Sequence, residues 1–223
     1  MDILFDLDGT LLDPKPGIIG SVQFALRELG LQVPPTEDLL HAIGPPLRDT
    51  FPALGVPAAE VERAVALYRA NYAGTGGNAP AMYDAEPYAG IEDELAALRR
   101  ADCRLIVATS KPRAFAQPIL REKGLARYFT AIHGAELDGT RDDKADLIAY
   151  IIATENVDPG QALMIGDRKF DIIGAKKNGL RSIGVSWGYG SVAELREAGA
   201  SALCDKPKGL HRLAMWMVTG TDK

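Results

Sequence analysis

The stretch Phe5-Asp6-Leu7-Asp8-Gly9-Thr10-Leu11 directly follows a short apolar run that is typical of a buried strand. Alternation along a strand predicts that the carboxylates of Asp6 and Asp8 point the same way. Gly9 allows a sharp turn, and Thr10 adds a hydroxyl and a backbone N–H group at the same corner. The pattern indicates a nucleophile beside an acid/base group at the carboxyl edge of a sheet.

An Asp-x-Asp-Gly sequence also occurs in calcium-binding loops and in ordinary surface turns. A calcium loop needs further oxygen ligands at close spacing, but here Leu11, Leu12 and Pro14 follow. A surface turn would not be preceded by a hydrophobic strand. The position of the two carboxylates therefore favours a catalytic role.

Length and composition limit the classes of protein to consider. A chain of 223 residues is long enough for one large domain, or for one domain that carries a smaller one. The net charge of -5 argues against binding to nucleic acid polymers, so we expect a small soluble ligand. Cys103 and Cys204 lack the spacing of a metal site or redox pair and are expected to be reduced thiols.

The sequence also predicts a location and an assembly state. The first strand begins at Asp2, which leaves no room for a signal peptide, and no apolar run approaches the ~20 residues that span a bilayer. We therefore expect a cytoplasmic protein with no membrane partner, as a monomer or a weak homodimer.

Helical periodicity dominates the first third of the chain. Amphipathic helices are predicted over residues 17–29 and 58–72, with shorter helices beginning at Thr36 and Leu47. The Gly-rich run Ala73–Asn78 then breaks the pattern and resembles a hinge. This predicts a core made of residues 1–13 and 81–223, with an inserted helical domain over residues 14–80 that is held by two connections, the hinge being one of them.

Strands and helices alternate beyond residue 80. Strands are predicted at residues 104–110, 128–134, 162–165, 182–185 and 202–204, and helices at residues 91–100, 112–123, 142–154 and 170–178. Short apolar strands separated by helices indicate a parallel sheet that is covered on both faces. The predicted fold is α/β, with a Rossmann-like core of three α/β/α layers.

Polar residues follow several of these strands, where ligands bind in open parallel sheets. The groups are Asp6 and Asp8, Thr109 and Ser110, Lys144, and Asp167 and Asp171. Each group has an ordinary explanation as a helix cap, a solvated lysine, a turn residue or a carboxylate in the first turn of a helix. Their joint occurrence at converging strand ends favours a shared site.

These residues also match a known family. The segments Asp6-Leu7-Asp8-Gly9-Thr10, Thr109-Ser110, Lys144 and Gly166-Asp167-Arg168-Lys169-Phe170-Asp171 resemble, in order and spacing, the four signature motifs of haloacid dehalogenase (HAD)-like hydrolases. The inserted helices resemble the helical C1-type cap of that superfamily. The segments 43–48, 109–112 and 187–190 resemble its phosphoglycolate phosphatase and 5'-nucleotidase branch.

The resemblance implies a Mg²⁺-dependent phosphomonoester hydrolase that works through an aspartyl phosphate. Asp6 would be the nucleophile and Asp8 the acid/base. Mg²⁺ would be needed because a carboxylate and a phosphate repel each other unless nearby cations neutralise them. Thr109 and Lys144 complete the expected catalytic set. The expected metal ligands are Asp6, Asp167, Asp171 and the backbone carbonyl of Asp8, and the expected substrate contacts are Thr10, Ser110 and the cap residue Arg48.

Several alternatives remain open on sequence grounds. The first candidate substrate is a nucleoside 5'-monophosphate and the second is phosphoglycolate, while a phosphomutase of the β-phosphoglucomutase type and a phosphate-accepting signalling module share much of the same chemistry. Arg48 fits a solvated helix position equally well, and Lys111 and Arg113 either read a substrate carboxylate or face solvent. Trp187 and Tyr189 either stack on a base or pack against the protein.

Overall fold

The computed structural model describes residues 1–75, 77 and 79–220, and the chain divides into two compact units. Met1–Asp13 and Pro87–Lys223 form the first, which we call the core unit. Pro14–Glu86 form the second, which we call the helical unit. The helical unit is therefore an insertion in the sequence of the core unit, directly after the segment that carries Asp6 and Asp8.

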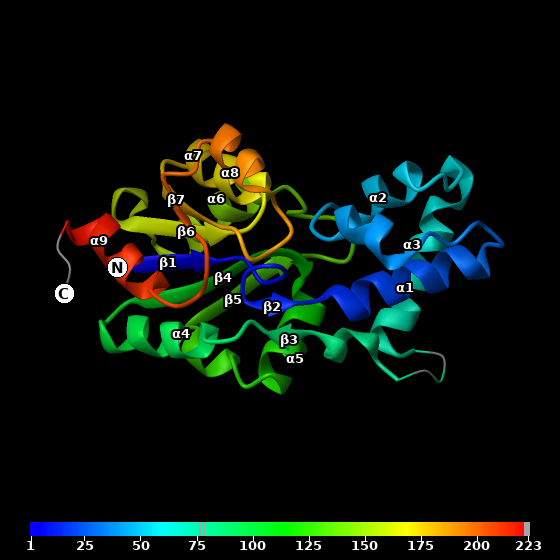
Figure 1. Ribbon diagram of the computed structural model, residues 1–223, viewed down its shortest axis with the longest axis horizontal. Helices are drawn as coiled ribbons and strands as arrows, with labels where there is room; N and C mark the ends of the chain where they lie inside the picture. Colours follow the sequence, from blue (N-terminus) through cyan, green and yellow to red (C-terminus); the bar gives the residue numbers. More distant parts are fainter. Residues whose placement is uncertain (76, 78, 221–223) are drawn as a thin grey trace. The chain divides into compact units, whose positions relative to one another are not determined.

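A six-stranded parallel sheet lies at the centre of the core unit, in the order β5-β4-β1-β6-β7-β8 (Figure 1). Its strands are β1 (Asp2–Phe5), β4 (Arg104–Pro112), β5 (Ala131–Ala135), β6 (Ala162–Gly166), β7 (Arg181–Val185) and β8 (Ala202–Cys204). Phe5 at the end of β1 pairs with Val107 on one side and Ile165 on the other. This register brings the residues that follow β1, β4 and β6 to one edge of the sheet.

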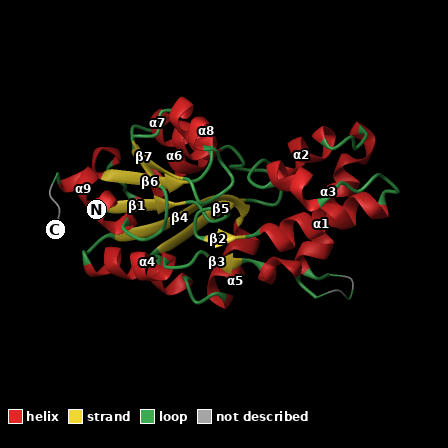
Figure 2. Cartoon of the chain, in the orientation of Figure 1, coloured by secondary structure: helices red, strands yellow, loops and turns green. Residues whose placement is uncertain are grey.

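Helices cover both faces of this sheet (Figures 1 and 2). One face carries α6 (Lys144–Glu155), α7 (Lys169–Lys177) and α8 (Val192–Ala198), and the other carries α4 (Ile91–Arg100), α5 (Arg113–Glu122) and α9 (Leu210–Thr219). Leu4, Ile106 and Met164 pack against Leu147 and Ile151 in a solvent-free cluster. These three layers confirm the predicted α/β, Rossmann-like core.

Several elements differ from those predicted by sequence periodicity. The strand expected from Tyr128 begins at Ala131, because residues Ala126–Tyr128 form a 3₁₀ turn that leads into the sheet. The strand expected over residues 104–110 continues to Pro112 through an irregularity between Thr109 and Pro112. Neither α8 nor α9 was expected. Two short strands, β2 (Leu12–Asp13) and β3 (Glu86–Pro87), pair with each other in a separate two-stranded sheet.

The helical unit is built from α1 (Lys15–Glu28), α2 (Leu47–Ala53) and α3 (Val61–Ala73), with 3₁₀ turns at Thr36–Ala42, Ala58–Glu60 and Ala81–Asp84. Its core is partly aromatic, because the rings of Phe51 and Tyr68 meet edge to face at 6.5 Å and those of Tyr68 and Tyr72 stack at 5.4 Å. In addition, Asn71 donates a hydrogen bond to the buried Ser21 hydroxyl. The unit thus has a hydrophobic core of its own.

The boundaries of the helical unit differ from the expected ones. The 3₁₀ turn Ala81–Asp84 packs against α1, and a Cβ atom at Gly17 would lie only 2.2 Å from the carbonyl oxygen of Ala81. Residues 81–86 therefore belong to the helical unit, and the chain returns to the core at Pro87. The expected hinge Ala73–Asn78 lies inside the helical unit rather than at a connection, and its residues 76 and 78 are outside the described part.

Among the residues described by the structure, no helix has the length and apolar character needed to cross a bilayer.

Candidate active site

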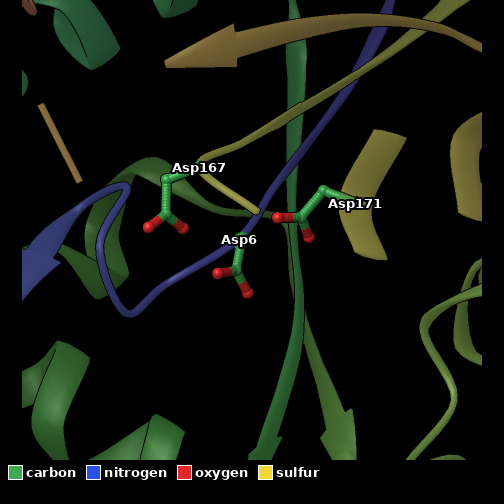
Figure 3. A group of neighbouring side chains, drawn as sticks. All are labelled: Asp6, Asp167 and Asp171. Carbon is green, nitrogen blue, oxygen red and sulfur yellow. The ribbon is translucent and has the colours of Figure 1, made fainter. Parts of the chain in front are cut away.

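Three carboxylates from distant parts of the sequence meet at the carboxyl edge of the core sheet (Figure 3). Asp6 follows β1, Asp167 follows β6, and Asp171 lies in the first turn of α7. Each offers an oxygen within 4.8 Å of the others. All three are buried, with 8%, 0% and 1% of their surfaces exposed, respectively.

Among the described residues, Lys144 supplies the one ammonium group that pairs with this cluster, through Asp6 and Asp171. Asp143 caps α6 by accepting hydrogen bonds from two backbone N–H groups, which places Lys144 at the first helical position. The Lys144 Nζ atom lies 2.8 Å from Asp6 Oδ1 and 2.9 Å from Asp171 Oδ1, and it also donates to the carbonyl of Ala108. Burial alone would lower the pKa of Lys144, but the two carboxylates outweigh it and raise this pKa.

The cluster carries more negative charge than its surroundings neutralise. If all three carboxylates were ionised, they and the one ammonium would carry a net charge of −2 in a site from which water is largely excluded. Burial, together with repulsion from Asp6 and Asp171, raises the pKa of Asp167 well above its usual range. Burial likewise raises the pKa of Asp171 to about 6, despite the opposing effect of Lys144.

The donor set fits a hard divalent cation. Every converging group is a carboxylate oxygen, which is the ligand type preferred by Mg²⁺, and the excess charge of the cluster matches that of one such ion. A Cβ atom at Gly9 would lie 2.2 Å from Asp167 Oδ2, so only glycine leaves room for the carboxylate at this position. Asp6, Asp167 and Asp171 are therefore the residues that could hold the metal.

Asp8 lies beside the cluster in a different electrostatic setting. Its Oδ2 atom accepts a hydrogen bond from Lys111, while its Oδ1 atom is buried and has no hydrogen-bond partner among the described residues. Burial raises the pKa of Asp8, although Lys111 opposes the rise. An elevated pKa suits a carboxyl group that must hold a proton before it donates it.

The contact between Lys111 and Asp8 was not anticipated from sequence. β4 is irregular between Thr109 and Pro112, so that Ser110 and Lys111 are extra residues relative to β5. Such bulges redirect side chains at the ends of strands. The sequence signal was the position of Lys111 directly after the second motif, but no local pattern links it to a residue that precedes it by 103 positions.

The hydroxyl-bearing residues of the first two motifs have individual partners. Thr10 donates to Asp167 at 3.4 Å, and the Thr109 hydroxyl accepts a hydrogen bond from the backbone N–H of Lys111. Ser110 donates to the carbonyl oxygen of Asp142, in the loop before α6. Thr10 and Thr109 are both buried, and Thr10 contacts the carboxylate cluster directly through Asp167.

Arg48 is the one predicted site residue that does not belong to the core unit. It lies in the first turn of α2, and its guanidinium donates two hydrogen bonds to Glu62 at 2.7 and 3.1 Å. Both side chains are exposed and both belong to the helical unit. Glu62, a residue of the neighbouring helix, is therefore one of its partners in this structure.

Sequence reasoning singled out residues 187–190 but did not anticipate that this loop supports Asp167. The backbone N–H of Tyr189 donates to Asp167 Oδ2 at 2.7 Å, and a Cβ atom at Gly188 would lie 2.4 Å from the same oxygen. Trp187 donates its ring N–H to the carbonyl oxygen of Thr10. The loop therefore holds Asp167, and its two aromatic side chains pack within the core unit. The signal was present as two glycines that alternate with aromatic residues directly after a strand.

Comparisons with known proteins agree with this geometry. The family model described as haloacid dehalogenase-like hydrolase matches residues 3–185. A 5'-nucleotidase of Pseudomonas aeruginosa is 46% identical over 196 residues, which cover 87% of this chain and 86% of that protein. A phosphoglycolate phosphatase of Cupriavidus necator is 31% identical over 216 residues, which cover 95% and 91% of the two chains.

Two further similarities extend the comparison. The tyrosine-protein kinase PtkA of Mycobacterium tuberculosis is 40% identical over 188 residues, which cover 84% of this chain but only 62% of the kinase. The crystal structure of a predicted phosphatase from Clostridium acetobutylicum superposes with a TM-score of 0.89 at 40% identity, and the match covers 96% of this chain and 97% of that chain. With its motifs gathered in one site, the chain belongs to the haloacid dehalogenase-like hydrolases and is a phosphoric monoester hydrolase of that family.

Proposed function

We propose that the protein is a Mg²⁺-dependent phosphatase that removes the phosphoryl group of a small metabolite through an aspartyl phosphate at Asp6. The observation that carries this proposal is the setting of Asp6. Its carboxylate lies at the sheet edge, 2.8 Å from the Lys144 ammonium, among further carboxylates that suit a divalent cation. This combination provides a nucleophile together with the positive charge that a phosphate dianion requires.

The first difficulty is electrostatic. A carboxylate that approaches a phosphate at 4 Å faces a repulsion of about 4 kcal/mol for each pair of unit charges, at an effective dielectric constant near 20. Lys144 offsets part of this repulsion, because its buried ammonium contacts Asp6 directly. When bound, Mg²⁺ supplies further positive charge at the phosphoryl oxygens. Asp6, Asp167 and the Asp8 carbonyl oxygen would hold the ion directly. Asp171 would hold it through a water molecule.

The chemistry proceeds in two displacements. Asp6 forms a bond to phosphorus as the bond from phosphorus to the ester oxygen breaks, and protonated Asp8 delivers its proton to the departing alkoxide. Asp8 then takes a proton from a water molecule, which attacks phosphorus and releases both inorganic phosphate and the Asp6 carboxylate. Thr109 supplies a hydroxyl donor for the phosphoryl oxygens. Thr10 and Ser110, whose hydroxyl groups donate to Asp167 and to the Asp142 carbonyl oxygen in this structure, would turn them to the phosphoryl oxygens when substrate binds.

The helical unit is proposed to act as a cap that excludes water during the first displacement. It is inserted at Pro14, four residues after Thr10, the last residue of the first motif. A change of backbone conformation at this junction would therefore be transmitted to the loop that follows Asp6 through few covalent bonds. Arg48 remains the proposed substrate contact of this unit. Its exposed ion pair with Glu62 is of a kind that contributes little stability, so releasing the guanidinium to a substrate anion costs little.

The proposed substrate is a nucleoside 5'-monophosphate, and the support for it is the 5'-nucleotidase relative at 46% identity. Phosphoglycolate is the alternative, supported by the phosphoglycolate phosphatase relative. The packing of Trp187 against the Thr10 carbonyl and the Tyr88 ring gives no separate support for base stacking.

A phosphatase screen tests the proposal directly. The purified protein is assayed against nucleotides, sugar phosphates and small phospho-acids, with Mg²⁺ and with a chelator, and D6N serves as the inactive control. We expect phosphate release that requires both Mg²⁺ and Asp6. Isomerisation of a hexose phosphate without phosphate release would instead indicate a phosphomutase, and a long-lived phosphoprotein without turnover would indicate a signalling module.

A further inference from the structure

A second group of charged residues lies at the same edge of the core sheet, outside the carboxylate site. Glu136 follows β5, Arg113 begins α5 directly after β4, and Arg141 belongs to the loop that leads to α6. Arg141 donates to Glu136 Oε1 at 2.6 Å, and Arg113 lies 3.9 Å from the same oxygen. Two guanidinium groups therefore share the one carboxylate of Glu136, while Asp138 lies within electrostatic reach of Arg141.

Arg141 is held in an unusual way. Its backbone φ of 65° is in the left-handed region, which a long side chain occupies only at an energetic cost. Its guanidinium carbon lies 4.4 Å from the centre of the Tyr150 ring, and its Nε atom is buried without a hydrogen-bond partner among the described residues. A buried donor without a partner is costly, so the guanidinium of Arg141 retains hydrogen-bonding capacity that Glu136 does not use.

Arg127 provides an internal comparison. It contacts Glu92 and lies 5.0 Å from the centre of the Tyr128 ring, so it makes the same kinds of contact as Arg141. However, it lies before the amino end of β5, at the opposite edge of the sheet, and its side chain is 63% exposed against 24% for Arg141. An ion pair and an aromatic contact therefore do not by themselves require burial or a left-handed backbone.

The position of the arginine pair relates it to the reaction. Strand β4 separates β5 from β1, so the carboxyl ends of β5 and β1 lie about 10 Å apart at the usual strand spacing. The loop that carries Arg141 is tied to the second motif by the hydrogen bond from Ser110 to Asp142. It also ends at Lys144, which contacts the nucleophile. A small phosphomonoester at Asp6 can therefore extend toward Arg141 and Arg113.

We propose that Arg141 and Arg113 form a subsite for a second anionic group of the substrate. This inference rests on the proposed phosphatase function and narrows its substrate class to phosphomonoesters that carry a carboxylate or a second phosphate near the ester. It therefore favours phosphoglycolate, the alternative substrate, over a nucleoside 5'-monophosphate, which has no second anionic group. Glu136 occupies the guanidinium groups in the absence of substrate and is displaced when the anion binds. Planar guanidinium groups bind carboxylates and phosphates through paired hydrogen bonds, which suits either anion.

The test compares matched substrates and matched variants. One pair is phosphoglycolate and 2-hydroxyethyl phosphate, in which a neutral hydroxymethyl group replaces the carboxylate. The other pair is a nucleoside 3',5'-bisphosphate and the corresponding 5'-monophosphate. The ratio of kcat/KM within each pair is measured for the wild type, R141M, R113M and the control R127M, and thermal unfolding of each variant verifies its fold. The two pairs distinguish a carboxylate subsite from a phosphate subsite.

We expect the wild type to prefer the more anionic member of at least one pair, and R141M to reduce this preference about 10- to 100-fold. R113M reduces it less, because Arg113 is the more exposed of the two arginines, and R127M leaves the ratio unchanged. The proposal is overturned if the wild type has no such preference, or if R141M lowers kcat/KM equally for both members of a pair, as a purely structural role requires.

Binding separates this proposal from the proposed function. Phosphonoacetate and ethylphosphonate differ by one carboxylate and cannot be hydrolysed as esters, so their affinities are compared by calorimetry in D6N and in D6N/R141M. Without hydrolysis of any substrate, the proposed function fails, but tighter binding of phosphonoacetate that depends on Arg141 still supports the subsite. Equal affinities in D6N, with no preference in turnover, refute the subsite.

Discussion

Asp167→Asn should make the metal-free protein more stable and abolish its response to divalent cations. Asp167 is fully buried beside two other carboxylates, and in the described part of the chain the one ammonium group at the cluster, that of Lys144, pairs with Asp6 and Asp171 rather than with Asp167. Asparagine has nearly the same shape and can keep the local contacts. Its carbonyl can accept from the Tyr189 backbone N–H, and its amide can donate to the Thr10 hydroxyl.

The size of the effect follows from the geometry. At a separation of 4.8 Å and an effective dielectric constant of about 20, each pair of like charges costs about 3.5 kcal/mol. Asp167 takes part in two such pairs, and Lys144 offsets part of the repulsion. A net gain of about 3 kcal/mol in the free energy of unfolding corresponds to a rise in Tm of roughly 6–12 °C for a chain of this size.

The effect should depend on pH. Burial and the neighbouring carboxylates raise the pKa of Asp167 in the folded state above its value in the unfolded chain. The folded protein therefore binds more protons than the unfolded chain, and its stability without metal falls as the pH rises above about 4. Below that pH, Asp167 is protonated in both states and resembles asparagine. The difference in Tm between D167N and the wild type should be largest at pH 8 and small near pH 4.

The assay is thermal unfolding in a chelator and in Mg²⁺ at several pH values, with the exposed first-turn residue Asp93 as a matched control. Mg²⁺ should raise the Tm of the wild type and of D93N, but not that of D167N. The reasoning is refuted if D167N is less stable than the wild type at pH 8 in the chelator, or if Mg²⁺ stabilises both to the same extent.

Three further substitutions test other parts of the account. Gly188→Ala places a Cβ atom 2.4 Å from Asp167 Oδ2, so the concentration of Mg²⁺ that gives half-maximal activity should rise about tenfold or more, as an activity titration measures. Asp8→Asn removes the proposed proton donor, so steady-state kinetics should show a loss of at least about 100-fold on alkyl phosphates and a smaller loss on p-nitrophenyl phosphate, whose leaving group needs no proton. Glu94→Gln weakens the carboxylate cap that accepts from the His211 N–H at the start of α9, and denaturant unfolding at pH 7 should show a loss of about 1–2 kcal/mol with activity kept. Burial would raise the pKa of Glu94, but the N–H groups of Gly209 and His211 outweigh it and lower this pKa. The contribution of Glu94 to stability is therefore present above about pH 4.5 and fades as the pH falls further. An equal loss of stability at pH 3 and pH 7 would contradict this assignment.

Much of the fold could be predicted because its signals are local. The apolar runs around Leu4, Ile106 and Met164 identified three strands of the sheet, since buried parallel strands require continuous hydrophobic sequence. The rule that ligands bind at the carboxyl ends of parallel strands then grouped Asp6 with Asp167, although they are far apart in sequence. Helix α8 could also have been predicted, because Ser191 and Glu194 have the spacing of a capping box.

Other features depend on tertiary contacts that no local pattern reveals. The ion pair between Lys111 and Asp8 arises from the irregular end of β4, and the left-handed conformation of Arg141 is imposed by its surroundings rather than by its side chain. The return of the chain to the core at Pro87 depends on how residues 81–84 pack against α1, which a composition change near residue 78 cannot indicate.

The most direct test of the central claim is to trap phosphorus on Asp6. The protein is mixed with Mg²⁺ and a phosphomonoester that it hydrolyses, and the reaction is quenched in acid within milliseconds. The protein is then treated with borohydride, which reduces an acyl phosphate to an alcohol. Mass spectrometry of the peptide that contains residues 1–15 should then show homoserine at position 6, only when both substrate and Mg²⁺ were present. Steady turnover with an unmodified Asp6, or with the modification at another carboxylate, would contradict the assignment of the nucleophile.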